Sequence, residues 1–493
     1  MRALASGPQG PDALRPLLTT VLDALRDGAT ARSGPLPAGG PEAVAADIRA
    51  ALGDVLPEQG DEDALRALVH TFAAGAADPA DPLCTAHLHC PPLAVATAAD
   101  LAASALNPSL DSWDQAPAAS ELEALVTAAL AEAVYGKRAE AQVAWPTAQV
   151  ARPPALVARP AEPAAQDTQP AAQVAQSAAA LVTTGGTESN QLALLLAREL
   201  HGRVQLVCAD TAHHSLRRAT WLLGLPEPIT VPAPTGTMDP AALDEVLGEL
   251  HGTGSPLLVA ATAGTTDAGH IDPLPAIADL CRTHRARLHI DAAYGGGLLF
   301  SDHHRAKLDG LARAHTVTLD LHKLGWQPVA AGLLAVQDPR DLRPLEHHAD
   351  YLNADDDTEA GLPDLLSRSL RTTRRPDILK IAVTLKTLGR QGLGALVDNV
   401  CARAQELADL VDAHPGLELY DRPTISTVLF RPAHATDHII AGLRRQLLTE
   451  GRAVLGRARL DGRLWLKATL LNPHTEPGDL AALLKLVEGP PRR

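Results

Sequence analysis

Two short stretches decide the fold, HIDAAYGG at residues 289–296 and DLHK at residues 320–323. Each follows an apolar run typical of a buried strand, Arg287 to Ile290 and Thr316 to Leu319. Ligands of open α/β sheets bind at the carboxyl ends of the strands, so Asp291 and Lys323 are expected to meet at one edge. Either motif alone is more often a solvated loop end or a capping carboxylate.

An aspartate and a lysine in this arrangement suit a pyridine ring that carries an aldehyde. The carboxylate of Asp291 would keep the ring nitrogen protonated, so that the ring takes up the electron pair left on a substrate Cα. The amine of Lys323 would form an imine with the aldehyde. The pair therefore predicts pyridoxal 5'-phosphate (PLP) as the cofactor.

Three upstream motifs suit the same sheet edge. The turn Thr184-Gly185-Gly186-Thr187 leads into the helical pattern QLALLLARE, and a helix amino terminus offers free N–H groups to a phosphate. An ordinary turn with a threonine cap is the alternative for this motif alone. AHHS at 212–215 and ATAGTT at 261–266 follow two further strand-like runs, which brings His213 and Thr262 toward the same edge.

Strand-like runs alternate with helical patterns along the middle of the chain, which predicts an α/β fold with a mostly parallel sheet covered by helices. The runs are Val204 to Cys208, Leu257 to Ala261, Leu288 to Ile290, Thr316 to Leu319 and Gly332 to Val336. We expect an amino-terminal helical segment over residues 1–100, a large domain over 101–370 and a smaller α/β domain over 371–493. Residues 139–178, rich in Ala, Pro and Gln, are expected to form a flexible insertion.

Composition narrows the function classes. The 493 residues carry a net charge of −15 and no basic stripe interleaved with aromatics, which disfavours nucleic-acid and anionic-membrane partners. The five cysteines lack CxxC spacing, which argues against a zinc site or a disulfide framework, so no metal is expected. The amino terminus lacks the apolar run of a signal peptide, and a cytoplasmic enzyme with a small-molecule substrate is expected.

Taken in order, the motifs resemble the group II PLP-dependent decarboxylases, the family of aromatic amino acid, glutamate, histidine and diaminobutyrate decarboxylases, over roughly residues 80–480. The resemblance implies the aspartate aminotransferase-like PLP fold type I. It also implies roles for the site residues. Gly186 and Thr187 would bind the phosphate with help from His322, and Lys323 would be the Schiff-base lysine. His213 and Ala293 would lie on the two faces of the cofactor ring, with Thr262 and Asp291 beneath the ring.

Four segments most resemble the branch of diaminobutyrate and lysine decarboxylases, which serve siderophore and polyamine synthesis. They are AHLHCPP at 86–92, LNPSLDSWDQAPAASELE at 106–123, DLHKLGWQPVAAG at 320–332 and LKATLLNPHT at 466–475. The implied reaction releases CO2 and an amine from a diamino acid: 2,4-diaminobutyrate, lysine or ornithine. Pro92, Pro376 and the Ala/Pro/Gln insertion depart from the branch pattern.

The resemblance extends to catalytic and substrate residues outside the cofactor motifs. His213 would orient the substrate carboxylate, and Tyr351, in an acidic segment bounded by Gly and Pro, would protonate Cα. Asp111, just before Ser112-Trp113, would pair with a distal ammonium in the partner subunit's pocket, or else cap a helix. Lys467 stands where glutamate decarboxylases have an arginine that contacts the substrate carboxylate. A homodimer with shared active sites is implied.

Other readings of the site stay open. One is an aromatic amino acid or glutamate decarboxylase. Another is a PLP enzyme of the aminotransferase or amine-oxidase-like kind, and the release of CO2 without ammonia would exclude this second alternative. A third, of a different class, is a regulator that keeps the PLP fold without catalysis, which cofactor absorbance would exclude.

Overall fold

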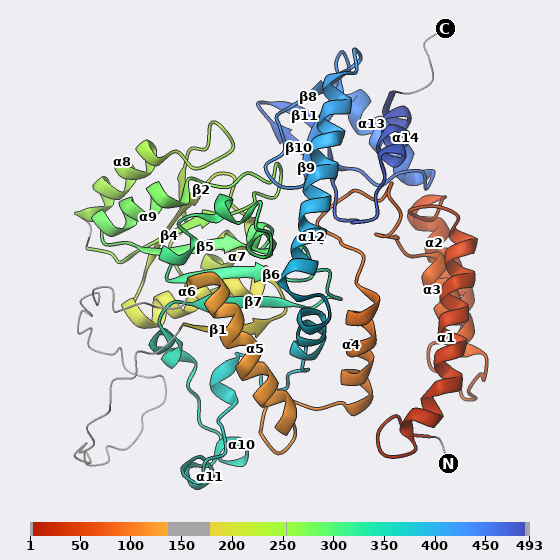
Figure 1. Ribbon diagram of the computed structural model, residues 1–493, viewed down its shortest axis with the longest axis horizontal. Coiled ribbons are helices and arrows are strands. Elements are labelled where there is room, and N and C mark those ends of the chain that lie inside the picture. The colour runs from red at the N-terminus through yellow and green to blue at the C-terminus, as the bar shows by residue number, and fades with distance from the viewer. Residues whose placement is uncertain (1–2, 137–177, 253, 489–493) are drawn as a thin grey trace.

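The computed structural model describes residues 3–136, 178–252 and 254–488. A seven-stranded sheet forms the centre of the molecule, and a four-stranded sheet lies beside it (Figure 1). The predicted insertion at 139–178 lies almost wholly outside the described residues.

The large sheet has the order β1-β7-β6-β5-β4-β2-β3. Only β7 runs antiparallel to its neighbours, so the predicted mostly parallel sheet is confirmed. Its strands are β1 (Ala179–Thr183), β2 (Gln205–Ala209), β3 (Ile229–Val231), β4 (Leu257–Thr262), β5 (Arg287–Ala292), β6 (Thr316–Asp320) and β7 (Gly332–Val336).

Side chains alternate between the two faces of β5 and β6, as the two-residue period of a strand requires. Leu288 and Ile290 of β5 belong to the main apolar core. His289 and Asp291 point to the opposite face, toward α6 (Gly186–His201), where Asn190 contacts both. A buried polar layer therefore lies beneath α6, and this layer carries the candidate site.

Helices cover both faces of the sheet. On one face lie α6 and α7 (His214–Leu222), which share apolar clusters with β2, β4, β1 and β7. The helices that pack in the main core on the other face are α5 (Pro117–Tyr135), α8 (Pro240–His251), α9 (Leu274–Thr283) and the first part of α12 (Ile378–Asp412). This layering is the one expected for an α/β sheet.

The four-stranded sheet belongs to a carboxy-terminal unit with its own core. Its strands follow the order β10-β11-β9-β8 and are antiparallel. The elements are β8 (Leu417–Leu419), β9 (Thr427–Pro432), α13 (Asp437–Thr449), β10 (Gly456–Leu460), β11 (Arg463–Thr469) and α14 (Pro477–Glu488). The long helix α12 joins the two cores, and its axis breaks at Gly389, where φ is +63°.

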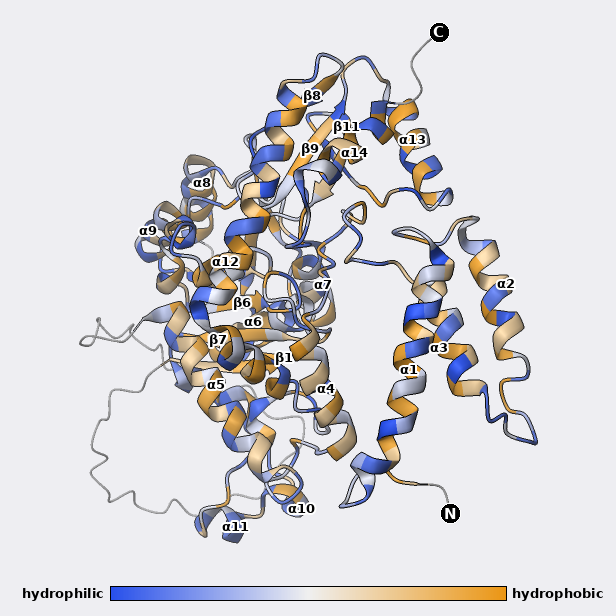
Figure 2. Ribbon diagram, turned by 45° about the vertical axis from the view of Figure 1, so that its right-hand side comes forward, coloured by the Kyte–Doolittle hydropathy of each residue, from blue (hydrophilic) through white to orange (hydrophobic). Residues whose placement is uncertain are grey.

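Three amino-terminal helices stand apart from the sheets in both views (Figures 1 and 2). They are α1 (Gly10–Arg32), α2 (Gly40–Leu52) and α3 (Ala64–Ala74). α1 and α2 both pack on α3, and α2 has no buried residue. Large apolar side chains remain exposed on these helices and between them, among them Leu22, Leu56 and Phe72. The predicted amino-terminal helical segment is present, and α4 (Ala94–Leu106), which packs on α12, follows it.

The predicted domain limits at residues 100 and 370 stay predictions. Residue 100 falls inside α4, and the connection before α12 includes the short helices α10 (Asp350–Asn353) and α11 (Asp355–Glu359). Among the described helices, none combines the length and apolar character needed to cross a membrane.

Candidate active site

Four of the predicted site residues lie at the carboxyl ends of β4, β5 and β6, namely Thr262, Asp291, His322 and Lys323. Thr262 and Asp291 are direct neighbours in the parallel register of β4 and β5. Asp320 ends β6, and Lys323 follows three residues later. The side chains of Asp291 and Asp320 are almost completely buried, so each carboxylate depends on partners within the protein.

The carboxylate of Asp291 is held by two donors. The backbone N–H of Ala293 donates to Oδ1 at 3.1 Å, and the side-chain amide of Asn190 donates to Oδ2 at 2.8 Å. Each oxygen keeps a second acceptor position, since a carboxylate oxygen can accept two hydrogen bonds. This geometry suits a carboxylate that must also face a pyridinium N–H.

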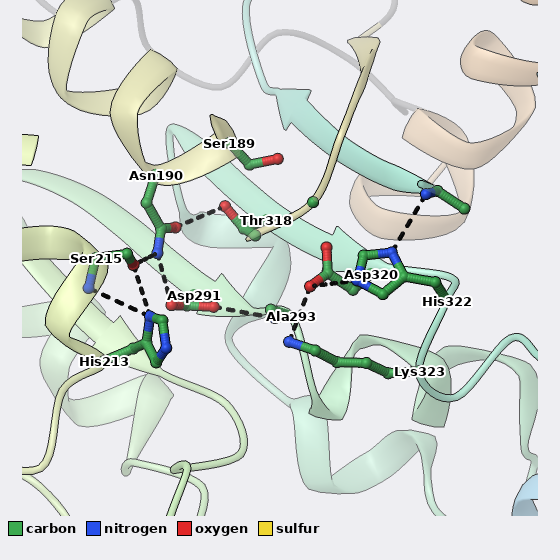
Figure 3. A network of polar contacts seen from close by, with 12 residues as sticks. Ser189, Asn190, His213, Ser215, Asp291, Ala293, Thr318, Asp320, His322 and Lys323 are labelled. Atoms are coloured by element: carbon green, nitrogen blue, oxygen red, sulfur yellow. Dashed lines mark hydrogen bonds and ion pairs between the residues drawn. The ribbon is translucent and has the colours of Figure 1, made fainter. Parts of the chain in front are cut away.

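Lys323, Asp320 and His322 form a second polar group beside Ala293 (Figure 3). Lys323 Nζ lies 2.8 Å from Asp320 Oδ2, and His322 Nε2 lies 3.5 Å from the same oxygen. The backbone N–H of Ala331 donates to His322 Nδ1 at 3.2 Å, so the ring proton of a neutral His322 lies on Nε2, toward Asp320. Burial lowers the pKa of His322.

The turn before α6 leaves little room for side chains. A Cβ on Gly186 would lie 3.0 Å from Ala293 Cβ and 3.2 Å from Asp320 Oδ2, and Gly185 has a φ of +151°. The first N–H groups of α6, from Gly186 and Thr187, have no partner within their own helix. The turn therefore presents backbone donors beside His322, an arrangement that suits a phosphate.

His213 is the N-cap of α7 and lies on the other side of Asp291 (Figure 3). Its Nδ1 accepts the backbone N–H of Ser215 at 3.3 Å and lies 2.8 Å from Ser215 Oγ. Burial lowers the pKa of His213, although the nearby Asp291 acts in the opposite direction. The imidazole is therefore neutral at pH 7 and fixed in orientation.

These residues fit PLP. Thr262 Oγ1 and Asp320 Oδ1 are buried and have no hydrogen-bond partner among the described residues, which leaves polar groups free for a ligand. Asp291 offers a carboxylate to a ring nitrogen, the turn at Gly186 offers donors to a phosphate, and Lys323 offers an amine to an aldehyde. All three lie around Ala293 (Figure 3).

A cavity of about 420 Å³ opens beside His322. It is lined by residues 87–90 and Pro92, from the segment before α4, and by His322 and residues 327–329. His87 and His89 line it, and no carboxylate does so in the described part of the chain. The cavity borders the Lys323 loop and is wide enough for a small amino acid side chain.

Three predicted residues do not join this group within one chain. Tyr351 lies on α10 with 81% of its surface exposed. Asp111 lies in the connection between α4 and α5, buried, with Oδ1 lacking a partner among the described residues. Lys467, on β11, donates to the Thr266 carbonyl at 2.9 Å, in the loop after β4, and burial lowers the pKa of its amine.

Sequence reasoning missed Asn190, Ser215 and Asp320 as members of the site. Asp320 lies within the DLHK motif, and Asn190 ends the polar run GGTESN, so both were visible as polar residues next to predicted contacts. The contacts of Asn190 on α6 with Ser215 on α7 and with Asp291 on β5 are a tertiary property that no local pattern indicates.

Comparisons of sequence and structure relate the chain to known proteins. Residues 155–433 match the model described as the pyridoxal-dependent decarboxylase conserved domain. L-2,4-diaminobutyrate decarboxylase from Rhizobium meliloti (strain 1021) is 39% identical over 436 residues, covering 85% of this chain and 79% of that protein. The enzyme of the same name from Acinetobacter baumannii is 31% identical over 464 residues, covering 87% and 83%.

A solved structure is similar over nearly the whole chain. It is the glutamate decarboxylase domain of diaminobutyrate-pyruvate transaminase and L-2,4-diaminobutyrate decarboxylase from Vibrio parahaemolyticus, with a TM-score of 0.80 and 30% identity. The match covers 98% of this chain and 96% of that one.

Proposed function

The chain belongs to the pyridoxal-dependent decarboxylase family, and from that premise we propose that it converts L-2,4-diaminobutyrate to 1,3-diaminopropane and CO2. In this reaction the bond from Cα to the carboxylate breaks, and a proton takes the place of the carboxylate on Cα. The observation that carries the proposal is the identity of 39% and 31% to two L-2,4-diaminobutyrate decarboxylases over more than four fifths of the chain. Lysine and ornithine are diamino acids too, and they are the alternative candidates for the substrate.

PLP supplies the chemistry, because its protonated ring accepts the electron pair that CO2 leaves on Cα. Asp291 would hold the ring nitrogen, and the backbone at Gly186 and Thr187 would bind the phosphate with help from His322. Lys323 would bind the cofactor covalently, while Thr262 and Ala293 would pack against its ring. The paired donors on Asp291 and the buried surroundings of Thr262 and Asp320 support these roles.

His213 would orient the substrate carboxylate. A neutral imidazole whose Nδ1 is already occupied by Ser215 offers Nε2–H as a donor. A donor directed at the departing carboxylate keeps the bond to Cα perpendicular to the ring, the orientation in which its electrons enter the π system.

Asp111 would select the diamino substrate. The cavity beside His322 has no carboxylate in its lining among the described residues, so a distal ammonium needs an acid from elsewhere. Asp111 supports this role because it is buried and its Oδ1 has no partner in the described chain. A buried carboxylate oxygen without a partner is costly, and an ammonium group would relieve that cost. Lys467 would act at the carboxylate end of the substrate.

A homodimer would complete the site, with Tyr351 and Asp111 serving the cofactor of a second copy. The exposed position of Tyr351 and the exposed apolar side chains on α1, α2 and α3 support this assembly, because apolar surface of this kind is usually covered by a partner. Tyr351 would then deliver the proton to Cα. The five free cysteines favour a reducing compartment, and we propose the cytoplasm.

The test is product identification. Purified enzyme with PLP is incubated separately with 2,4-diaminobutyrate, lysine, ornithine, glutamate and an aromatic amino acid, and amines are identified by mass spectrometry. We expect 1,3-diaminopropane with an equal amount of CO2 and no ammonia. Efficient turnover of glutamate or an aromatic amino acid instead would contradict the proposed substrate class.

A further inference from the structure

We infer that Asn190 is a positioning residue that fixes two groups of the proposed site at once, the carboxylate of Asp291 and the ring tautomer of His213. Asn190 lies in the second turn of α6 and has no exposed surface. Its amide reaches β5, β6 and α7, and it uses every hydrogen-bonding position that an asparagine side chain has. Figure 3 shows its contacts with Asp291, Ser215 and Thr318.

The orientation of the Asn190 amide follows from Asp291. An ionised carboxylate only accepts hydrogen bonds, so the Asn190 atom 2.8 Å from Asp291 Oδ2 is the amide nitrogen. The same nitrogen donates its second hydrogen to Ser215 Oγ at 2.9 Å. Asn190 Oδ1 therefore faces the opposite way, toward β6 and His289.

Two donors on the other side hold the amide in this orientation. Thr318 Oγ1 and His289 Nε2 both lie 3.0 Å from Asn190 Oδ1, and each must donate to it. Burial lowers the pKa of His289 to about 4, so its ring is neutral with its one N–H on Nε2. His289 Nδ1 then accepts from Thr316 Oγ1 at 2.9 Å. If the Asn190 amide were rotated by 180°, its NH2 group would face two donors and its oxygen would face the Asp291 carboxylate, so the orientation is fixed.

The direction of the hydrogen bonds continues to His213. Ser215 Oγ accepts from Asn190, so its single hydrogen is free to bond His213 Nδ1, 2.8 Å away. The backbone N–H of Ser215 donates to the same ring nitrogen. Nδ1 therefore holds no proton in the neutral ring, and His213 keeps its N–H on Nε2. The charged and titratable groups whose fields reach this ring are Asp291, His214, Lys323 and Asp320.

One amide thus sets the carboxylate that would hold the cofactor ring and the imidazole that would orient the substrate. The half that concerns His213 rests on the proposed function, because it matters only when a substrate carboxylate is present. The half that concerns Asp291 is independent of the substrate and can be measured by cofactor binding alone.

Two variants separate the effect on Asp291 from the effect on His213. Each variant is compared with the wild-type holoenzyme. Asn190→Leu keeps the branched shape of the side chain, in a somewhat larger volume, but removes all four hydrogen bonds. We expect its PLP dissociation constant to rise roughly tenfold to a hundredfold, because Asp291 Oδ2 loses its donor. Ser215→Ala leaves the bond from Asn190 to Asp291 in place. It should bind PLP with nearly wild-type affinity but show a lower kcat and a displaced acid limb in the pH profile of kcat.

Thr220→Val is the matched control for Ser215→Ala. Thr220 is a buried hydroxyl residue of the same helix, but its Oγ1 donates to the Arg217 carbonyl and contacts no residue of the site. A direct readout comes from holoenzyme labelled with 15N-histidine, in which the signal missing from His213→Gln identifies His213. The wild type and Thr220→Val should show the Nε2-protonated form, and Ser215→Ala a mixture of the two tautomers.

The inference is overturned if Asn190→Leu binds PLP as tightly as the wild type. It is also overturned if Ser215→Ala matches Thr220→Val in kcat, pH profile and His213 signal. Should Asn190→Leu not fold, Asn190→Ser, which keeps one donor, is titrated with PLP in its place and is expected to show a smaller loss of affinity. A wild-type enzyme that binds PLP but releases no diamine would contradict the proposed function and leave the cofactor measurement valid.

Discussion

The amine of Lys323 lies 2.8 Å from Oδ2 of Asp320, so the lysine proposed to bind the cofactor is one half of an ion pair. An ammonium has no free electron pair, and the amine must give up a proton before it can attack an aldehyde. Asp320 and, through it, His322 are the groups nearest to that proton.

Replacing Lys323 with alanine should abolish turnover while leaving part of the PLP bound, because the contacts at the phosphate and at Asp291 remain. After borohydride reduction, intact-protein mass spectrometry should detect a covalent cofactor on the wild type and none on Lys323→Ala. Amine production by Lys323→Ala at the wild-type rate would show that another group has this role.

Asp291→Asn should be nearly inactive. A neutral amide cannot stabilise the pyridinium charge, so the ring becomes a poorer acceptor of electrons. The measurements are kcat and the pH dependence of the cofactor's visible absorbance. A kcat within about threefold of the wild-type value would disprove the assignment. Such a change is well below the tenfold change that one pKa unit of lost interaction energy would give.

Tyr351→Phe should bind PLP and consume substrate but give less amine. If the proton reaches the cofactor carbon instead of Cα, the products are pyridoxamine phosphate and the matching aldehyde, which chromatography detects. An unchanged amine yield would mean that a different acid protonates Cα. Mixing Tyr351→Phe with Lys323→Ala tests the shared site, because a mixed dimer would regain one complete site.

Asp111→Asn should raise KM for a diamino acid more than for an uncharged analogue of the same length. The loss of a charge-assisted contact in a closed site is roughly 1.5 to 3 kcal/mol, on the order of tenfold to a hundredfold. Asp114→Asn is the matched control, because Asp114 is an exposed carboxylate in the same connection. Equal losses for charged and uncharged substrates would make Asp111 a structural residue.

The stability of the fold should fall as the pH drops below about 6.5, the usual pKa of histidine. Burial lowers the pKa of His289 to about 4 and that of His315 to about 3. The unfolded chain therefore binds protons between these values and 6.5 while the folded chain does not. Each group lowers the free energy of unfolding by up to about 1.4 kcal/mol per pH unit in that window.

Urea unfolding at pH 7 and pH 5 measures this loss. His315→Gln removes one of the two titrations and should give a smaller difference between the two pH values, whatever its stability at pH 7. An equal difference in the variant and the wild type would exclude His315 as a source.

The central sheet was predictable because its strands are short, apolar and followed by small or polar residues. The run Thr316 to Leu319 corresponds to β6, and Gly332 to Val336 to β7. β1 was not predicted, since its five residues directly follow an Ala-rich stretch without a clear boundary. Cofactor residues at strand ends could be predicted because ligands of open α/β sheets bind at the carboxyl ends of the strands. Asn190 and Ser215 act through contacts between distant segments, which the sequence pattern does not indicate.

The helix α12 has its own consequence for the architecture. Ile378, Ile381 and Val397 belong to the core of the large sheet, and Leu407 and Val411 to the core of the small one. A chimera that exchanges the small unit with that of a relative must therefore place its junction inside this one helix, between Cys401 of the first core and Ala404 of the second. Modular exchange at this point needs compensating substitutions along one helix, and the two units are expected to melt in a single transition.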